Sequence, residues 1–459
     1  MHHLSDYFVI LATKIYSIMR NSLIITLIAG VAVVLGATSC DKNVYDENTH
    51  RELIHYYSAV DSVDQQHMWM LTQNQSLRYQ VPSGGNYTQL RIYSANPLSD
   101  SKAELMNQIY VSAGKSGVLS VDVPYQVTTL YAALADESGN LTVTSFPSSQ
   151  VSIDFTDVST GKALSSLKPQ TYTYLYEENY PEPGDYDYND VVIRVSQQRT
   201  AVNQITINVT LSAVGATKQI AGCIRLVGYK YDDVDSVYTT TGVSFNDGIN
   251  DQTLYPFGDL YSDKTVAHSL LMKGRSQEAV LNLFCDAHWA MAFNVDADYG
   301  LFTRKKYNVM DPNNESYDTN TYQSRATRSL TYVITFKEDN QNVIQSLDNF
   351  TLNTVDPFIV TYYNGGNWET HVEQFKSAKV LADYAVASFK DLPWALMVPQ
   401  SDFRYPQEGT EIGYRKRLDS GITVMMGAYT TTGHSFGEWA EDHTRFLDWY
   451  LYPNTQMIY

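Results

Sequence analysis

Oxygen-bearing side chains alternate along one short stretch, Asp185-Tyr-Asp187-Tyr-Asn189-Asp190, and an apolar run at 191–195 follows it directly. Carboxylates this close together repel one another, so a cation between them is the simplest way to hold them. Calcium suits such a site, because it takes several carboxylate, amide and carbonyl oxygens from a flexible loop. The stretch therefore predicts a calcium site with four candidate ligands: Asp185, Asp187, Asn189 and Asp190.

Two earlier carboxylates, Glu177 and Glu178, are further candidate ligands from the same loop. The Pro- and Gly-containing turn at 181–184 is expected to be irregular and to present carbonyl oxygens. In an extended segment, alternate side chains share one face. The first three ligands would then face the ion, while the two intervening tyrosines pack on the other side. Asp190 would either lie with the tyrosines or bind the ion through a backbone kink.

The acidic stretch is not an EF-hand. Asp190 stands where that loop needs glycine, and Ser196 stands where it needs a bidentate glutamate. The alternative to a metal site is a surface loop whose acidic side chains cap Asx turns and bind no ion.

A second polar pair, Asp286 and His288, would share a face if residues 281–289 form a strand. Asp286 would then approach the same ion. We interpret His288 as a hydrogen-bonded structural histidine, because calcium prefers oxygen ligands.

Composition limits the function classes for this chain. Its 459 residues suffice for two or three domains, and its formal net charge is −18 with 36 tyrosines. An acidic chain lacks the basic face that nucleic-acid binding needs, and abundant aromatics argue against disorder. Tyr, Thr, Val and Asn with few charged residues favour strands, as in exported β-rich proteins.

The N-terminus has the pattern of a secretory signal. Arg20 precedes an apolar run at 22–36, and the small residues Ala37-Thr-Ser lead to Cys40. This approach to cysteine resembles the lipobox of bacterial lipoproteins, in which the cysteine is lipidated. A membrane-spanning helix is the alternative, for which the apolar run is short.

The boundaries follow from that pattern. Residues 1–18 are expected to be a non-native upstream extension, 19–39 the lipoprotein signal peptide, and 40–66 the lipidated cysteine with a polar tether. Acidic residues after the cysteine resemble those of Bacteroidota surface lipoproteins. We therefore expect an outer-membrane, surface-exposed protein, whereas the sorting rule of other Gram-negative bacteria would read Asp41 as inner-membrane retention.

The mature chain is predicted to be mainly β, with short helices only. Short alternating strands over 67–155 predict an N-terminal β-sandwich, with one helix at 102–108. Residues 156–170 are predicted to be a linker, and 171–459 a second, jelly-roll-like β-sandwich. Cys223 and Cys285 either form a disulfide or are buried free thiols.

No catalytic motif stands out, and we expect no enzyme activity. The chain has no Gly-x-Ser-x-Gly elbow, no His-Glu-x-x-His and no phosphate loop. Paired carboxylates for glycoside hydrolysis are defined only in space. Aromatic side chains offer sugar-stacking surfaces, with core packing as the alternative reading of each tryptophan; the candidates are Trp368, Trp394, Trp439 and Trp449.

Several ordered segments between about Tyr172 and Tyr452 resemble LruC-domain proteins. They are Glu177-Glu-Asn-Tyr-Pro-Glu-Pro-Gly-Asp-Tyr-Asp-Tyr-Asn-Asp190, Leu211-Ser-Ala-Val-Gly-Ala216, Leu283-Phe-Cys-Asp-Ala-His288, Asp356-Pro-Phe-Ile-Val360 with His371, and Leu392-Pro-Trp-Ala395 with the closing Phe403-Arg-Tyr-Pro406 and Asp448-Trp-Tyr450. The upstream Arg91-Ile-Tyr-Ser-Ala-Asn-Pro97 also fits the usual N-terminal part of that family. Tyr188 replaces the usual Phe, Glu178 a frequent Asp, and Cys285 lies inside its motif, but no departure removes an oxygen ligand.

The resemblance implies a bacterial surface lipoprotein with β-sandwich domains and no known activity, and the acidic loop looks like a calcium site of related exported domains. We therefore expect a non-catalytic, lipid-anchored protein with structural calcium, binding a glycan, host or matrix component. A structural or accessory subunit of a surface assembly is the alternative, and a glycan-degrading enzyme is a third.

Overall fold

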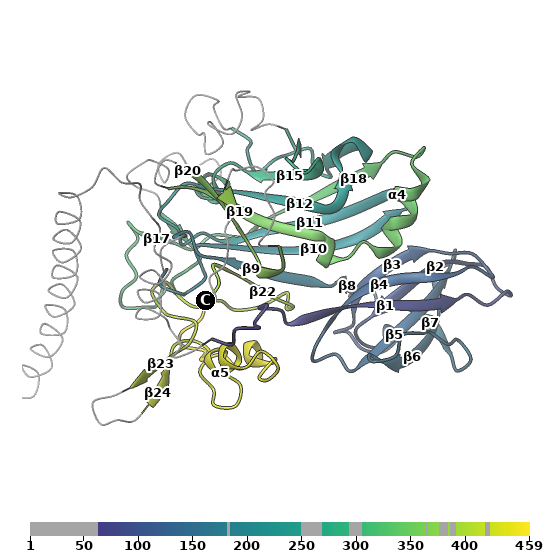
Figure 1. Ribbon diagram of the computed structural model, residues 1–459, viewed down its shortest axis with the longest axis horizontal. Coiled ribbons are helices and arrows are strands. Elements are labelled where there is room, and N and C mark those ends of the chain that lie inside the picture. The colour runs from purple at the N-terminus through teal and green to yellow at the C-terminus, as the bar shows by residue number, and fades with distance from the viewer. Residues whose placement is uncertain are drawn as a thin grey trace, which may run out of the picture. The chain divides into compact units, whose positions relative to one another are not determined.

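The computed structural model describes residues 63–180, 184–248, 269–292, 305–363, 366–375, 384–385, 392–417 and 423–459. All of them belong to one compact unit, His55–Tyr459. The signal peptide, Cys40 and most of the predicted tether lie outside the described residues. The mainly β prediction is confirmed, because short strands dominate and helices are few and short (Figure 1). No helix in the described ranges is both long and apolar enough to cross a membrane.

The N-terminal sandwich packs a strand pair, β1–β4, against a six-stranded sheet in the order β7-β6-β5-β2-β3-β8. Its strands are β1 (Thr72–Gln80), β2 (Tyr87–Tyr93), β3 (Glu104–Tyr110), β4 (Ser116–Pro124), β5 (Thr129–Asp136), β6 (Asn140–Pro147), β7 (Ser159–Lys162) and β8 (Lys168–Pro169). Leu77 and Leu119 from the pair meet Leu90 and Ile109 from the sheet in a fully buried core. Each such aliphatic side chain stabilises the fold by about 1.5–3 kcal/mol.

Two predictions for this half of the chain are wrong. The helix expected at 102–108 is the strand β3, which lies between β2 and β8 and is buried along most of its length. Burial on both faces removes the alternation of apolar and polar residues that marks a strand. The remaining residues, which are good helix formers, then favour the prediction of a helix. The segment expected to be a linker, 156–170, carries the two short edge strands β7 and β8.

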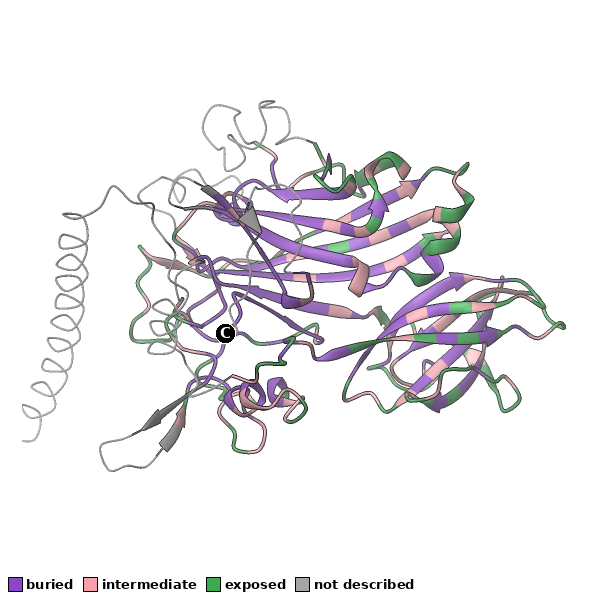
Figure 2. Cartoon of the chain, viewed as in Figure 1, coloured by how far each residue is buried: buried purple, intermediate pink, exposed green. Residues whose placement is uncertain are grey.

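The second sandwich places two six-stranded sheets face to face. One sheet has the order β13-β18-β11-β10-β9-β22, with β9 (Thr171–Tyr176), β10 (Val191–Ala201), β11 (Gln204–Ala213), β13 (Val234–Thr239), β18 (Arg328–Phe336) and β22 (Ala395–Val398). The other has the order β14-β15-β12-β19-β20-β21, with β12 (Ile220–Lys230), β14 (Leu271–Lys273), β15 (Glu278–Phe284), β19 (Val355–Tyr363), β20 (Gly366–His371) and β21 (Tyr384–Ala385). Their facing sides share one apolar core, and buried residues run along the strands in Figure 2.

Smaller elements complete the second sandwich. Strand pairs are β16 (Lys306–Tyr307) with β17 (Tyr322–Gln323) and β23 (Tyr414–Arg417) with β24 (Thr423–Met426). Within the described residues, the helices are α3 (Ala287–Ala292), α4 (Gln341–Ser346) and α5 (Phe436–Glu441). Single 3-10 turns are η1 (Tyr231–Asp233), η4 (Leu347–Asn349), η5 (Leu352–Thr354), η6 (Glu373–Phe375) and η7 (Trp449–Leu451).

A second, aromatic core packs beneath the acidic loop. It joins Tyr186 and Tyr188 of the loop to rings from the C-terminal segment, among them Phe436, Trp439 and Trp449. Trp439 and Trp449 are fully buried and stack with their ring centroids 5.7 Å apart. Together with the buried Trp394, they are core residues and not surfaces for sugar stacking. Of the four candidate tryptophans, Trp368 remains, and it is half-buried.

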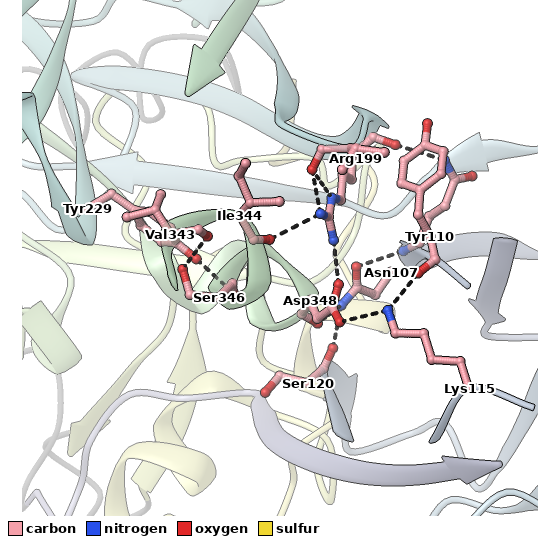
Figure 3. Close-up of polar contacts among 12 residues, drawn as sticks. Asn107, Tyr110, Lys115, Ser120, Arg199, Tyr229, Val343, Ile344, Ser346 and Asp348 are labelled. Atoms are coloured by element: carbon pink, nitrogen blue, oxygen red, sulfur yellow. Dashed lines mark hydrogen bonds and ion pairs between the residues drawn. The ribbon is translucent and has the colours of Figure 1, made fainter. Parts of the chain in front are cut away.

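Polar contacts join the two sandwiches (Figure 3). Arg199, at the end of β10, forms a buried ion pair with Asp348 of η4 inside the second sandwich, and Lys115 of the N-terminal sandwich approaches the same carboxylate at 3.6 Å. The Nε2 of Gln108 donates to the Arg199 carbonyl at 2.7 Å, and the Tyr110 hydroxyl donates to the next carbonyl at 2.8 Å. The strand that follows the acidic loop therefore also anchors the N-terminal sandwich.

Candidate metal centre

The acidic loop connects two neighbouring antiparallel strands, β9 and β10, whose last pair is Tyr176 opposite Val191. Glu177 directly follows β9, and Asp190 directly precedes β10. The backbone N–H of Glu178 donates to Asp190 Oδ2 at 2.6 Å, which closes the base of the loop. Strand pairing therefore fixes both ends of the loop and brings its carboxylates into one small volume.

Three of the predicted ligands meet at one point. Glu177, Asp185 and Asp187 each offer a carboxylate oxygen, and these oxygens lie within 4.8 Å of one another. Glu177 and Asp187 are buried, whereas Asp185 is exposed, so the group is open to solvent on one side. Glu177 Oε1 accepts from the Tyr188 N–H at 2.7 Å, but its buried Oε2 has no hydrogen-bond partner among the described residues.

Asn189 carries a second unsatisfied oxygen. Its Nδ2 donates to the Pro406 carbonyl at 3.1 Å, while its buried Oδ1 finds no hydrogen-bond donor in the described part of the chain. A buried polar atom without a hydrogen-bond partner lowers the stability of the fold by about 1–3 kcal/mol. Two such oxygens on one loop therefore indicate that a binding partner is missing. An ion coordinated by oxygen atoms would supply one.

Two glycines leave room for these oxygens. A Cβ on Gly184 would lie 1.8 Å from Glu177 Oε2, and a Cβ on Gly215 would lie 2.0 Å from Asn189 Oδ1. Any other residue at either position would displace the oxygen. The close approach of backbone to both ligand candidates is therefore a built feature of the loop.

The backbone of the loop differs from the extended segment expected from sequence. Tyr186 and Tyr188 have φ of 56° and 54°, in the left-handed region that non-glycine residues rarely adopt. Such strain costs about 1–3 kcal/mol per residue and persists only where the surroundings impose it. Here both rings are buried in the aromatic core, and the Tyr188 hydroxyl donates to the Pro393 carbonyl at 2.8 Å. The tyrosines thus pack away from the carboxylates, as expected, by a different backbone route.

Burial and mutual repulsion make the carboxylates reluctant to ionise. Burial, reinforced by the charges of Asp190, Asp185 and Asp187, raises the pKa of Glu177 well above its usual range. Burial and the neighbouring Asp185 and Asp190 do the same to the pKa of Asp187, and burial with Glu178 raises the pKa of Asp190. The ion-free loop must therefore take up protons or carry uncompensated charge, and a divalent cation would relieve both.

The remaining two predicted ligands have other partners. The Glu178 carboxylate accepts from Thr217 N at 2.9 Å, from Thr217 Oγ1 at 2.7 Å and from Lys218 N at 2.7 Å. It clamps the loop to the turn after β11. Asp190 uses Oδ2 to close the loop base. Both side chains support the site from outside the group that the other three carboxylates form.

Sequence reasoning missed a second segment of the site, which comes from far along the chain. The Gly409 N–H donates to Asp187 Oδ2 at 2.8 Å, and the Ile412 N–H donates to the Tyr186 carbonyl at 2.8 Å. Glu408 on this segment forms an ion pair with Lys306. Burial and the charge of Asp185 raise the pKa of Glu411 to about 7. No local pattern marks these residues, because they lie more than 100 positions from the loop.

The pair Asp286 and His288 is placed differently from the prediction. The strand ends at Phe284, and the helix α3 follows. Asp286 Oδ1 accepts from the backbone N–H of His288 at 2.8 Å and of Trp289 at 3.2 Å, so Asp286 caps that helix. The His288 Nε2 lies 2.9 Å from the Ala216 carbonyl, as a structural histidine would.

Cys223 and Cys285 are both buried free thiols in the structure. Burial raises the pKa of Cys223 well above its usual range and that of Cys285 to about 12. Neither is a reactive thiolate at neutral pH.

A family model described as a domain of unknown function, DUF4842, matches residues 200–450. The chain belongs to the DUF4842 family. In this DUF4842 protein the match begins near the end of β10, so the acidic loop precedes it, whereas Lys306 and Glu408 lie inside it. The narrower resemblance to LruC-domain proteins stays a prediction.

Solved structures resemble this DUF4842 protein only distantly. The crystal structure of a "putative lipoprotein" from Bacteroides ovatus matches with a TM-score of 0.46 at 16% identity, over 81% of this chain and 99% of that one. A biofilm-associated protein B domain matches with a TM-score of 0.17 at 11% identity, over 84% of this chain and 94% of that one. No curated protein matches the chain.

Proposed function

We propose that this DUF4842 protein is a non-catalytic lipoprotein of the cell envelope whose β9–β10 loop holds a structural calcium ion. The observation that carries the proposal is the buried, unpartnered Glu177 Oε2 beside the carboxylates of Asp185 and Asp187. Clusters of acidic residues alone are common on acidic proteins. A fully buried carboxylate oxygen without a hydrogen-bond donor is uncommon, because burying it costs free energy unless a cation coordinates it.

The chemistry of the donors fits calcium better than a transition metal. Carboxylate and amide oxygens are available, and neither a thiolate nor an imidazole belongs to the group. Glu177, Asp185 and Asp187 would hold the ion, and the unpartnered Asn189 Oδ1 offers an amide oxygen on the same loop. When bound, calcium would supply the positive charge that the loop lacks.

Calcium in this position would act through the fold. The loop sets the entry of β10, the aromatic core lies under it, and the 405–412 segment closes over it through Gly409. A bound ion would therefore lock these three parts together. We propose that the sandwiches so stabilised present a surface to a glycan, a host protein or a matrix component.

Half-buried Trp368 offers a first residue to test for glycan stacking, since its ring lies 5.4 Å from that of Tyr180, next to the loop. Saturable capture on a glycan array that Trp368→Ala abolishes would support a binding module. Concentration-dependent self-assembly would instead support a structural subunit, and release of product with time would support a glycan-degrading enzyme.

Thermal unfolding with calcium and with chelator tests the calcium proposal. A ligand of the folded state adds about 2.7 kcal/mol of stability at one hundred times its Kd. We expect calcium to raise the melting temperature of the wild-type chain and to leave Asp187→Ala unchanged. Identical melting of the wild-type chain in calcium and in chelator would refute the site.

A further inference from the structure

An ion pair stands at the edge of the acidic loop. Lys306 of β16 contacts Glu408 of the closing segment, and their side chains are only 17% and 14% exposed. The Tyr307 N–H donates to the Val214 carbonyl at 2.7 Å and the Val214 N–H donates back at 3.0 Å, which fixes β16 beside the end of β11. Backbone pairing thus fixes the strand that carries Lys306, and Glu408 holds its ammonium.

Glu408 also lies beside the candidate ligands. A Cβ on Gly215 would meet Asn189 Oδ1 at 2.0 Å and Glu408 Oε2 at 3.1 Å, so both oxygens border the same small space. Only Oε1 of Glu408 makes the short contact with Lys306. The other oxygen faces the loop.

The charge of Lys306 acts on the loop as a whole. Glu408 is in direct contact with the Lys306 ammonium, and Asp190 and Asp187 also attract it. Lys218, in the turn after β11, donates hydrogen bonds from its ammonium to the Glu178 carbonyl and to Asn179 Oδ1.

We propose that Lys306 and Glu408 set the cation affinity of the loop, with Lys306 as an internal counter-charge that competes with the cation for Glu408. This inference rests on the proposed calcium site and adds its regulation. Without a cation, Lys306 offsets part of the negative charge and keeps the loop folded. With a cation, Glu408 adds a carboxylate to the site, and the lysine repels the ion and weakens its binding.

The pair lets the loop stay folded with and without calcium. A loop without Lys306 would bind calcium more tightly but would depend on calcium for folding. The native loop binds calcium more weakly and stays folded when the calcium concentration falls.

Calorimetric titration of calcium into the full chain in detergent tests this inference. Lys306→Met is expected to lower the Kd about tenfold, which corresponds to about 1.4 kcal/mol, and to lower the melting temperature in chelator. Lys306→Arg keeps the charge and should retain the wild-type Kd. Lys305→Met is the matched control, because it removes the same charge from the neighbouring position, whose charge acts on Asp318.

Glu408→Gln should raise the Kd about tenfold or more. The double variant with Lys306→Met should depart from the sum of the two single effects, since both residues belong to one interaction. A Kd of Lys306→Met equal to that of Lys305→Met would overturn the inference while leaving the calcium site intact. A wild-type chain that binds no calcium would overturn both.

Discussion

At the residue scale, two side-chain oxygen atoms of the acidic loop are the strongest indication of a bound cation. Glu177 Oε2 and Asn189 Oδ1 are buried and unpartnered among the described residues, and a glycine leaves space beside each. The identity of the loop ligands was readable from sequence, because Asp185 and Asp187 are neighbours in the chain. Glu408 and Lys306 were not, because only tertiary packing brings them to the loop.

Gly215→Ala should damage the site although it replaces no ligand. Its Cβ would lie 2.0 Å from Asn189 Oδ1, so the amide must move, and crowding of a packed site costs about 1–3 kcal/mol. We expect lower stability in urea unfolding and weaker calcium binding. Gly84→Ala is the control, because nothing lies within 4 Å of its Cβ. Equal behaviour of the two variants would contradict the tight approach at Gly215.

Acidification should stabilise the calcium-free protein. The folded-state pKa values of Glu177 and Asp187 lie above their unfolded values, so the folded chain binds more protons in that window. Stability therefore falls as pH rises above the unfolded pKa of about 4 and is recovered as pH falls towards it. Melting temperatures from pH 8 down to pH 5 in chelator should rise, and calcium should reduce this dependence. A flat or opposite profile in chelator would show that the carboxylates are not strained.

At the element scale, β10 links two features of the molecule. The acidic loop leads into its first residue, Val191, and Arg199 near its end binds the N-terminal sandwich. The apolar run at 191–195 made β10 predictable. The neighbouring β3 was mistaken for a helix, because contact with the second sandwich buries polar Asn107 and Gln108 and removes the alternation.

The buried pair between Arg199 and Asp348 lies within the second sandwich and holds Asp348 where Lys115 of the N-terminal sandwich reaches it, so breaking the pair should loosen the junction. Removing one partner leaves a buried charge and costs about 3–5 kcal/mol. We expect Arg199→Ala to lower stability by that amount in urea unfolding and to speed proteolysis between the sandwiches. Lys273→Ala breaks the exposed pair with Asp232, where the cost is about 0–1 kcal/mol, and serves as control. An equally small effect at Arg199 would show that the pair does not hold the junction.

At the scale of the whole molecule, the sequence indicates an acidic, exported and membrane-anchored chain. Composition and strand punctuation were enough to predict two β-sandwiches, because those signals are spread over the chain. The polar junction between them was not predictable, and the segment expected to be a linker holds edge strands β7 and β8 of the first sandwich.

Cys40→Ser tests the anchor. Lipidation at Cys40 would carry the chain into the detergent phase of a phase-partition assay, whereas a Cys40→Ser chain that has lost residues 1–39 should stay in the aqueous phase. Lys42→Ser nearby should partition as the wild-type chain does. Detergent-phase partition of a Cys40→Ser chain without residues 1–39 would contradict lipidation at this cysteine.

We expect the β9–β10 loop to bind one calcium ion through Glu177, Asp185 and Asp187. Equilibrium dialysis of the full chain against radioactive calcium measures it directly. We predict one tightly bound ion per chain, lost in Glu177→Gln, which keeps the size of the side chain and removes its charge. Glu278→Gln, at the distant β15, should retain the ion. No bound calcium in the wild-type chain, or equal binding by Glu177→Gln, would show that the β9–β10 loop does not bind calcium through Glu177.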